Sequence, residues 1–449
     1  MVRRNRLFSG LAMVCWPLVA GAQTAPDLAG ILERLDRVER ENRALAEQVK
    51  TLETKLEALG TAPGAAAAAQ PRQPSTDDRL EIQQARIDEL AQTKVEAAQK
   101  FPIRLTGMAL FNAFMNSKQN GGAEYPAVAV APGAAFSGAT LRQTTIGLEY
   151  RGPTTLWGGA VHGSFYMDFF AGAANSAMRM RTGSIEIDWK DRSVMVGVEK
   201  PIFNPREPSS LAQVGVSPLT GAGNLWLWLP QARVEQDLHF DSSTGLRARL
   251  GVIQTREVGP YPGTGFTPPV EAARPGLEGR FEFFHNLDDE RRLEIAPGFH
   301  TSTTHAGGWS IPSHIFSVDW LFNPWRRLEF TGAFYTGQNV TPLGAGYQQG
   351  YGMYATGPEA VHSLGGWGQF TIHAARRVDL HLFTGQQDDN NEDLIAGRIG
   401  KNLLIGGNLY YRLAPNVLLG LESSQLRTTY LGQGIRINNH YDLALGYFF

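Results

Sequence analysis

From Ile103 to the last residue, apolar and polar positions alternate with a period of two. In the first segment, Ile103, Leu105 and Phe111 fall on one face, and Arg104 and Asn112 fall on the other. This alternation predicts β-strands with one apolar face. Similar segments start near residues 103, 142, 156, 180, 193, 231, 246, 277, 292, 314, 327, 362, 378, 402, 417 and 437. We therefore predict about 16 strands over residues 101–449.

The connections between these segments alternate in length. Short turns such as 286–291 and 414–416 follow long polar or Gly-rich loops such as 115–140 and 338–361. An even number of strands of about ten residues, with turns short at one end and long at the other, is typical of transmembrane β-barrels. The predicted fold class is an all-β transmembrane barrel of about 16 antiparallel strands. A soluble β-sandwich is the alternative.

The N-terminal part of the chain has a different period. Apolar positions there are spaced alternately by three and four residues, with one polar exception: Leu28, Ile31, Leu35, Val38, Asn42, Leu45, Val49, Leu52, Leu56 and Leu59. This heptad pattern predicts an α-helical coiled coil over residues 23–60, in which Asn42 fixes register and oligomer number. The number of helices in the coil stays open, and a single amphipathic helix is the alternative.

Two further segments complete the organisation of the chain. Residues 1–22 combine Arg3, Arg4 and Arg6 with an apolar run and the small residues 20–22, which predicts a cleaved secretory signal peptide. Residues 61–100 contain an Ala/Pro-rich linker and a second, weaker helical segment in the periplasm. After residue 22 no run approaches 18 apolar residues, so we expect any membrane-spanning part to be a closed barrel.

Composition narrows the classes of function. The formal net charge is −2, which provides no basic field for nucleic acid. The single Cys, Cys15, lies in the predicted signal peptide, so we expect no disulfides, cysteine catalysis or Cys-based metal site in the mature chain. No metal-ligand spacing, nucleophile elbow or phosphate loop is present, and we expect no cofactor and no enzymatic activity.

Arginine is the main basic residue of the predicted barrel. Residues 101–449 contain 23 Arg and 4 Lys against 29 acidic residues, so any charge selectivity must be local. The guanidinium group binds carboxylates and phosphates in a bidentate manner, and pores lined by arginine favour anions. The strand pattern places several charged residues in the lumen, where each is either a selectivity group or solvated wall: Arg233, Glu235, Arg247, Arg249 and Arg280.

The loop of residues 203–229 is unusually apolar for a solvent-exposed connection and also carries Arg206 and Glu207. Apolar surface of this extent favours burial. We predict that the loop folds into the barrel and narrows the pore; an outward contact with a neighbouring subunit is the alternative.

The segments MRMRTGSIEIDW, VMVGVEKPIFNP and LPQARVEQ, with the long loop between the last two, resemble the DcaP-like and phosphate-selective (O/P type) trimeric porins. The heptad helix and Phe449 are similar to the DcaP-like branch. The resemblance implies a 16-stranded trimer that takes up small anions such as dicarboxylates, with Arg179, Arg181 and Arg233 in the pore. Strict alternation would turn Arg179 and Arg181 towards lipid, so either a β-bulge intervenes or they lie above the membrane. Where these porins usually have Gly-Gln before the constriction loop, this sequence has Val198-Glu199, which adds a negative charge near the opening.

The sequence thus predicts an outer-membrane porin of a Gram-negative-type bacterium. Its expected partners are outer-membrane lipids, further copies of the chain and small hydrophilic solutes. Two other classes stay open. One is a structural protein that tethers the envelope to peptidoglycan through its coiled coil, and the other is an outer-membrane hydrolase.

Overall fold

The computed structural model describes residues 102–155, 157–172 and 176–449. The strands are β1 (Ile103–Asn116), β2 (Phe136–Thr140), β3 (Thr145–Thr154), β4 (Ala160–Ala171), β5 (Ala177–Asp188), β6 (Arg192–Glu199), β7 (Leu229–His239), β8 (Thr244–Gln254), β9 (Pro275–Asn286), β10 (Arg292–Ala306), β11 (Trp309–Trp325), β12 (Leu328–Gln338), β13 (Tyr351–Tyr354), β14 (Gly357–Ala360), β15 (His362–Ala375), β16 (Val378–Asp389), β17 (Ile399–Ala414), β18 (Val417–Tyr430) and β19 (Gly434–Phe448). Short 3-10 helices are η1 (Thr341–Leu343), η2 (Gly346–Gln348) and η3 (Asn391–Asp393). The predicted signal peptide, coiled coil and second helical segment lie outside the described residues.

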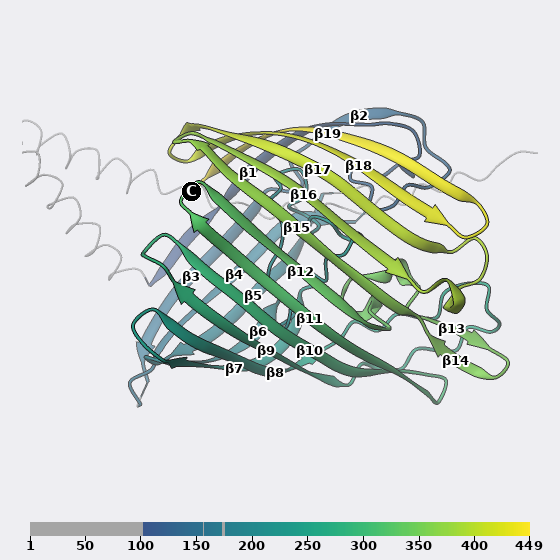
Figure 1. Cartoon of the computed structure of the whole chain (residues 1–449), viewed down its shortest axis with the longest axis horizontal. Coiled ribbons are helices and arrows are strands. Elements are labelled where there is room, and N and C mark those ends of the chain that lie inside the picture. Colours follow the sequence, from purple (N-terminus) through teal and green to yellow (C-terminus); the bar gives the residue numbers. More distant parts are fainter. Residues whose placement is uncertain (1–101, 156, 173–175) are drawn as a thin grey trace, which may run out of the picture. The chain divides into compact units, whose positions relative to one another are not determined.

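Seventeen of these strands form one antiparallel sheet that closes on itself (Figure 1). Closure occurs at β1, which pairs with β19 on one side and with β2 and β3 on the other. β3 pairs with residues 103–108 of β1 and β2 with residues 112–116, so β2 and β3 fill successive parts of one position in the wall. The barrel therefore has 16 strand positions, as predicted. The remaining two strands, β13 and β14, form a separate hairpin.

The two-residue period separates an apolar outer face from a polar inner face, as the sequence predicts. On β9, Leu277 and Phe283 are 45% and 44% exposed on the outside, whereas Glu278 and Arg280 are 0% and 1% exposed on the inside. The outward apolar side chains are left nearly half exposed, which is the arrangement of a strand that faces lipid.

The two ends of the barrel differ in their connections. Seven short turns gather at one end, for example residues 240–243 and 415–416, whereas long loops gather at the other. We call three of the long loops L1 (residues 117–135), L3 (residues 200–228) and L6 (residues 339–361). At the long-loop end, where the sequence predicts long connections, residues 307–308 and 431–433 instead form short turns. Gly307 and Gly308 have φ values of 57° and 81°, which a two-residue type I′ turn requires.

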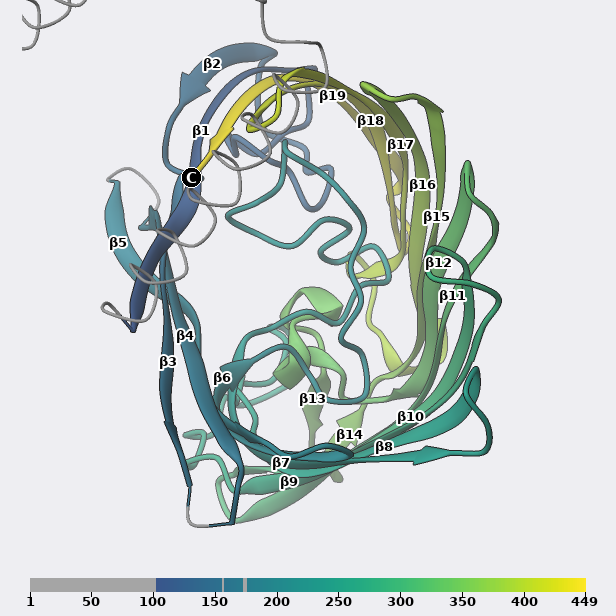
Figure 2. The same cartoon turned by 90° about the vertical axis from the view of Figure 1, so that its left-hand side faces the viewer.

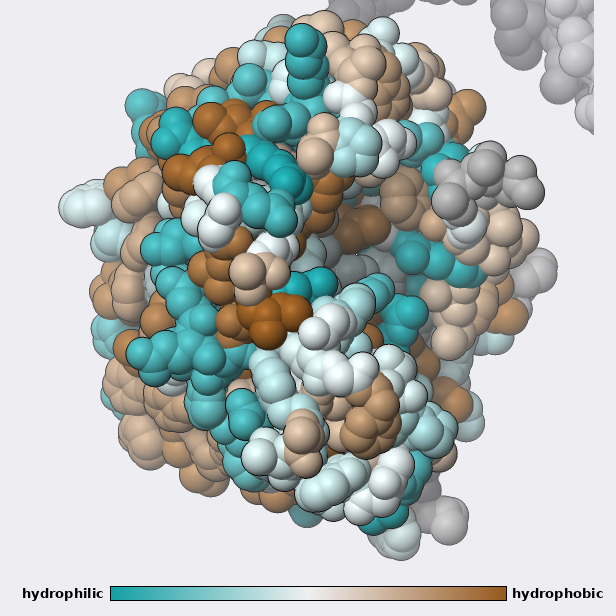
Figure 3. Space-filling model, turned by 90° about the vertical axis from the view of Figure 1, so that its right-hand side faces the viewer, coloured by the Kyte–Doolittle hydropathy of each residue, from teal (hydrophilic) through white to brown (hydrophobic). Residues whose placement is uncertain are grey.

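The buried core lies inside the barrel, where the long loops pack against the wall. L3 runs through the interior in the view from the short-turn end (Figure 2). Residues of L1 and L6 belong to buried clusters with L3 and the strands: Ala129 of L1 packs with Leu219, and Leu343 of L6 packs with Leu225. The long-loop end is hollowed near its centre, and hydrophilic side chains border the hollow (Figure 3). Among the described residues, no helix is long and apolar enough to cross a membrane.

Candidate functional site

L3 is held inside the barrel by hydrogen bonds from inward-facing polar side chains of the strands. The Ser317 hydroxyl on β11 donates to the Phe203 carbonyl at 3.1 Å. On β15 and β17, Gln369 accepts from the Ser209 backbone N–H at 2.7 Å and Asn408 donates to the Ser209 carbonyl at 2.8 Å. A buried loop needs such partners for its backbone groups. The prediction that this loop folds inward is therefore confirmed.

The apolar residues of L3 explain why the loop leaves water. Leu225 packs with Ile253, Ile315 and their neighbours, and Leu219 packs with Trp367 and neighbouring side chains. Leu211 enters a third cluster, near β1 and β17 to β19. L3 thus follows the inner wall through three apolar contacts and reduces the open cross-section of the barrel.

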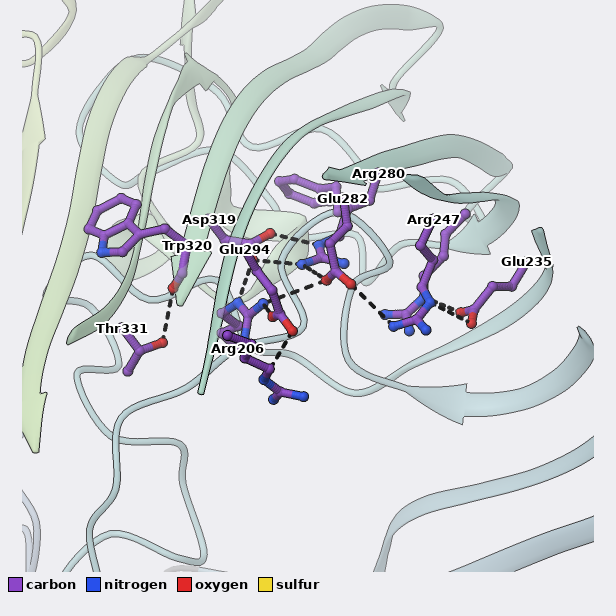
Figure 4. A network of polar contacts seen from close by, with 12 residues as sticks. Arg206, Glu235, Arg247, Arg280, Glu282, Glu294, Asp319, Trp320 and Thr331 are labelled. Carbon is purple, nitrogen blue, oxygen red and sulfur yellow. Dashed lines mark hydrogen bonds and ion pairs between the residues drawn. The ribbon is translucent and has the colours of Figure 1, made fainter. Parts of the chain in front are cut away.

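A charged network joins L3 to the inner faces of β9, β10 and β11 (Figure 4). Arg206 of L3 contacts Asp319 at 2.5 Å, Glu294 more closely, and Glu282 at 3.6 Å. Arg280 makes a bidentate contact with Asp319, at 2.7 and 2.8 Å, and contacts Glu282 at 2.6 Å. The predicted loop residue Arg206 and wall residue Arg280 therefore meet on shared carboxylates.

The network continues along β7 and β8. Arg247 contacts Asp237 at 2.9 Å and Glu282 at 3.1 Å, and Arg249 is paired with Glu235. In all, the network holds five arginines and five carboxylates: Arg206, Arg247, Arg249, Arg280, Arg292, Glu235, Asp237, Glu282, Glu294 and Asp319. Its formal charges cancel. The strand pattern predicts Arg247, Arg249 and Arg280 on the inner face, and in the structure all three are paired with carboxylates there.

Arg179 and Arg181 on β5 both point inward because of a β-bulge. Tyr166 of β4 pairs with Thr182 and Met167 pairs with Met180, so Arg181 has no partner in β4. The bulge is the first of the two alternatives that the sequence left open. An extra residue of this kind lets two nearby side chains face the same side of a sheet.

Both arginines of the bulge bind Asp168, which is fully buried. Arg179 binds it in a bidentate manner, at 2.8 and 3.0 Å, and Arg181 binds it at 3.2 Å. The two guanidinium groups also donate to the carbonyls of Val214 and Gly215 in L3. Two positive charges thus share one carboxylate and fix the middle of the loop.

Glu207 and Lys200, at the start of L3, form a pair of their own. Their charged groups lie 2.7 Å apart, and the Ser217 hydroxyl donates to Glu207 at 2.7 Å. Glu207 therefore contributes to the internal cohesion of the loop.

Glu199 and Arg233 line a recess of about 800 Å3 on the inner faces of β3 to β7. Tyr166 lies in the same recess, and its hydroxyl donates to Glu149 at 2.6 Å. In the described part of the chain, Arg233 has no carboxylate within 4 Å, unlike the arginines of the network. The structure therefore separates Arg233 from the other predicted arginines.

Two histidine groups were missed by sequence reasoning because their members come from different strands. His162 lies between Asp188, at 3.2 Å, and Glu186, at 3.6 Å. Their ligand atoms lie within 4.8 Å of one another, and among the described residues this is the group of three side chains that could hold a metal ion. Its two carboxylates contact different nitrogens of the imidazole, an arrangement that also suits a simple ion pair.

The second group has the connectivity of a hydrolase triad. His300 contacts Glu278 and Ser302, each at 2.8 Å. Ser302 is only 8% exposed, and a Cβ at Gly276 would lie 2.8 Å from the Ser302 Cβ. Glu278 also accepts a hydrogen bond from the Ile202 backbone N–H at 2.6 Å. The group of Glu278, His300 and Ser302 anchors the start of L3 and leaves no room for a substrate at Ser302.

No protein-family model matches the sequence, and no curated protein matches it either. Among solved structures, the outer membrane channel DcaP of Acinetobacter baumannii matches with a TM-score of 0.64 and 14% identity, over 77% of this chain and 97% of that one. An anion-selective porin from Comamonas acidovorans has a TM-score of 0.48 at 11% identity, over 77% and 99%. A loop-deletion mutant of the outer membrane protein OmpT of Vibrio cholerae has 0.47 at 9%, over 77% and 99%. The first likeness shows the fold: this chain is a 16-position antiparallel barrel that resembles outer-membrane porins.

Proposed function

We propose that the chain is an outer-membrane porin through which small hydrophilic solutes diffuse passively. The observation that carries this proposal is the closed 16-position barrel, apolar outside and charged inside, with L3 along its inner wall. Barrels of about this size leave an aqueous channel. Charged groups that face the interior are too costly to keep there without partner charges or water.

The recess lined by Glu199 and Arg233 is the part of the lumen that we assign to the solute path. No residue of L3 lines this recess, although the loop contacts β5 through Arg179 and Arg181 and the far wall through β15 and β17. Solutes would then pass along the inner faces of β3 to β7, with L3 as the constriction.

A preference for anions such as dicarboxylates or phosphate stays a prediction. In its favour, Arg179 and Arg181 share a single carboxylate, and Arg233 has no carboxylate within 4 Å among the described residues. Against it, the charges of the Arg206 network cancel, and the recess contains Glu149, Glu186 and Glu199. We therefore expect only weak selectivity between chloride and potassium.

The assembly and location belong to the same proposal. We infer a homotrimer in the outer membrane, held together in part by the predicted coiled coil of residues 23–60, with this segment and the short turns in the periplasm. Chemical crosslinking of isolated outer membranes tests the trimer: a band of three chains is expected, and a monomer alone contradicts it.

Swelling of proteoliposomes in uncharged sugars tests the diffusion function. If the lumen is an open passage, a pentose enters fastest, a hexose more slowly and a trisaccharide slowest, because wall friction rises with solute size. Liposomes that swell no faster than protein-free vesicles in any of the three sugars would reject the porin proposal.

A further inference from the structure

The recess on the inner faces of β3 to β7 carries charges of both signs, and two of its charged groups, Arg233 and Glu199, form no ion pair within the described residues. Arg233 and Arg151 supply positive charges, and the negative charges come from Glu149, Glu186 and Glu199. The recess has a volume of about 800 Å3, enough for a small solute and several water molecules. Ser164, Ser184 and Tyr166 add hydrogen-bonding groups to its wall.

Arg233 stands apart from the other arginines of the barrel interior. In the described part of the chain it makes no hydrogen bond and has no carboxylate within 4 Å, and its Nε is buried without a partner. Glu199 likewise has no basic group within 4 Å among the described residues. By contrast, Arg206, Arg249 and Arg280 are all paired.

The strand register keeps these opposite charges apart. Glu186 of β5 pairs with Met195 of β6, which pairs in turn with Arg233 of β7. The backbones of Glu186 and Arg233 are therefore two strand spacings apart, about 10 Å. Glu199 lies four residues beyond Met195 on the same face of β6. The positive and negative groups face one recess without forming a pair, so a solute can contact both without breaking an internal ion pair.

We propose that this recess binds small zwitterions that carry an ammonium and a carboxylate group, as amino acids do. The solute carboxylate binds the fork of Arg233, whose geometry suits two parallel hydrogen bonds. The solute ammonium binds Glu199, with Glu186 and Glu149 as further negative charges nearby. A solute that carries only one charge meets a repelling group as well as an attracting one. This assignment rests on the proposed channel function and names its substrate class.

Three solutes of nearly equal size test the proposal. Alanine carries both charges, lactate replaces the ammonium with a hydroxyl, and alaninol replaces the carboxylate with a hydroxymethyl group. We would measure the initial entry of each labelled solute into proteoliposomes at neutral pH and subtract the leak of protein-free vesicles. In the wild type, alanine should enter about threefold or more faster than either of the others, the size of effect that exposed charge pairs give.

Two variants separate the roles of the charges. R233Q should slow alanine and lactate but speed alaninol, because it removes an attraction for carboxylates and a repulsion for ammonium groups. E199Q should slow alanine and alaninol but speed lactate. The matched controls R427Q, on the outer face of β18, and E359Q, on β14, should leave all three rates unchanged.

The outcomes also separate this proposal from the channel function. If none of the three solutes enters faster than in protein-free vesicles, the channel function fails. If all three enter, but alanine shows no advantage or R233Q and E199Q shift every solute alike, the channel stands and the zwitterion site is refuted.

Discussion

At the residue scale, the interior of the barrel is organised by arginines that share carboxylates. Arg206 is the member of the network that belongs to L3, and it lies against Asp319 and Glu294, which are almost fully buried. A buried carboxylate that loses its partner keeps the cost of desolvation without the compensating attraction. Arg206 should therefore matter both for stability and for holding the loop against the wall.

Replacing Arg206 by alanine should lower the free energy of unfolding by about 3 kcal/mol, the cost of breaking a buried ion pair. Denaturant unfolding of the detergent-solubilised protein measures this change. The control Arg427→Ala, at an outward-facing exposed arginine, should cost well under 1 kcal/mol. Equal losses in the two variants would mean that the Arg206 contacts do not stabilise the fold.

Asp241, in the turn between β7 and β8, gives a pH-dependent prediction. Hydrogen bonds from the backbone and side chain of Ser243, together with the Thr244 backbone N–H, lower its pKa to about 2. The carboxylate therefore stabilises the turn above the unfolded-state pKa of about 3.9, and the effect is lost as the pH falls towards 2.

The thermal unfolding temperature of Asp241→Ala should accordingly lie below that of the wild type at pH 6, and the gap should close between about pH 4 and pH 2. A gap that persists unchanged at pH 2 would contradict the role of the ionised carboxylate.

The face of the sheet on which each charged residue lies could be predicted from the sequence, but the pairing of arginines with carboxylates could not. The two-residue period is enough to place Arg233, Arg247 and Arg280 on the inner face. Which carboxylate each arginine meets depends on the register between strands, since Arg280 and its partner Asp319 lie 39 residues apart on β9 and β11. No local signal in the sequence encodes that register.

At the scale of elements, β5 shows how one additional residue changes what a strand presents. The bulge at Arg181 lets Met178 and Met180 stay outside, at 60% and 51% exposed, while Arg179 and Arg181 both bind Asp168. The sequence shows that strict alternation from Ile185 would turn the charged Arg179 towards lipid. The resolution depends on the pairing with β4, which the sequence does not specify.

Two single-residue deletions in β5 make a matched test of the bulge. Deleting Arg181 removes the bulged residue and leaves Met180 facing lipid. Deleting Met180 instead forces Arg181 into the outward position. Because an arginine that faces lipid costs up to a few kcal/mol, depending on depth, the Met180 deletion should be less stable by about 2 kcal/mol.

Refolding yield into detergent and denaturant unfolding provide the measurement for both deletions. If the Arg181 deletion is as unstable as the Met180 deletion, the bulge does not set the direction of these side chains.

L3 is the element whose burial the sequence predicted from composition alone. Its inward fold depends on apolar contacts such as that of Leu225, which is fully buried among side chains of β8, β11 and L6. The inward folding of L1 and L6 was not foreseen, because the apolar residues of these loops are separated by Gly-rich and polar stretches, and some of their contacts are made by backbone groups. An example is the hydrogen bond from the Ala129 backbone N–H to Thr428, at 2.8 Å.

Leu225→Ala should destabilise the barrel by about 3 kcal/mol through the cavity that it leaves, and should raise the open-channel current noise as L3 loosens. The lipid-facing control Leu443→Ala should leave the current noise unchanged, since Leu443 lies on the outer face of β19 and is 42% exposed. Denaturant unfolding and single-channel recordings of both variants provide the comparison. If the open-channel current noise of Leu225→Ala equals that of the wild type, L3 is held by its polar contacts alone.

At the scale of the whole molecule, the proposed function depends on a closed wall with water inside. The sequence predicts closure through the even number of alternating segments, and the pairing of β1 with β19 realises it. The sequence could not predict how much of the interior stays open, because that depends on how L1, L3 and L6 pack after the wall has closed. Arg233 and Glu199, which form no ion pair within the described residues, line a recess to which L1, L3 and L6 contribute no residue.

Single-channel recording of the full-length protein in planar lipid bilayers shows whether the closed wall encloses a water-filled passage. We expect stepwise, ohmic current increments in KCl, with a reversal potential near zero in a salt gradient because the lumen carries nearly balanced charge. Protein that inserts into the bilayer as a folded barrel but passes no ionic current would contradict it.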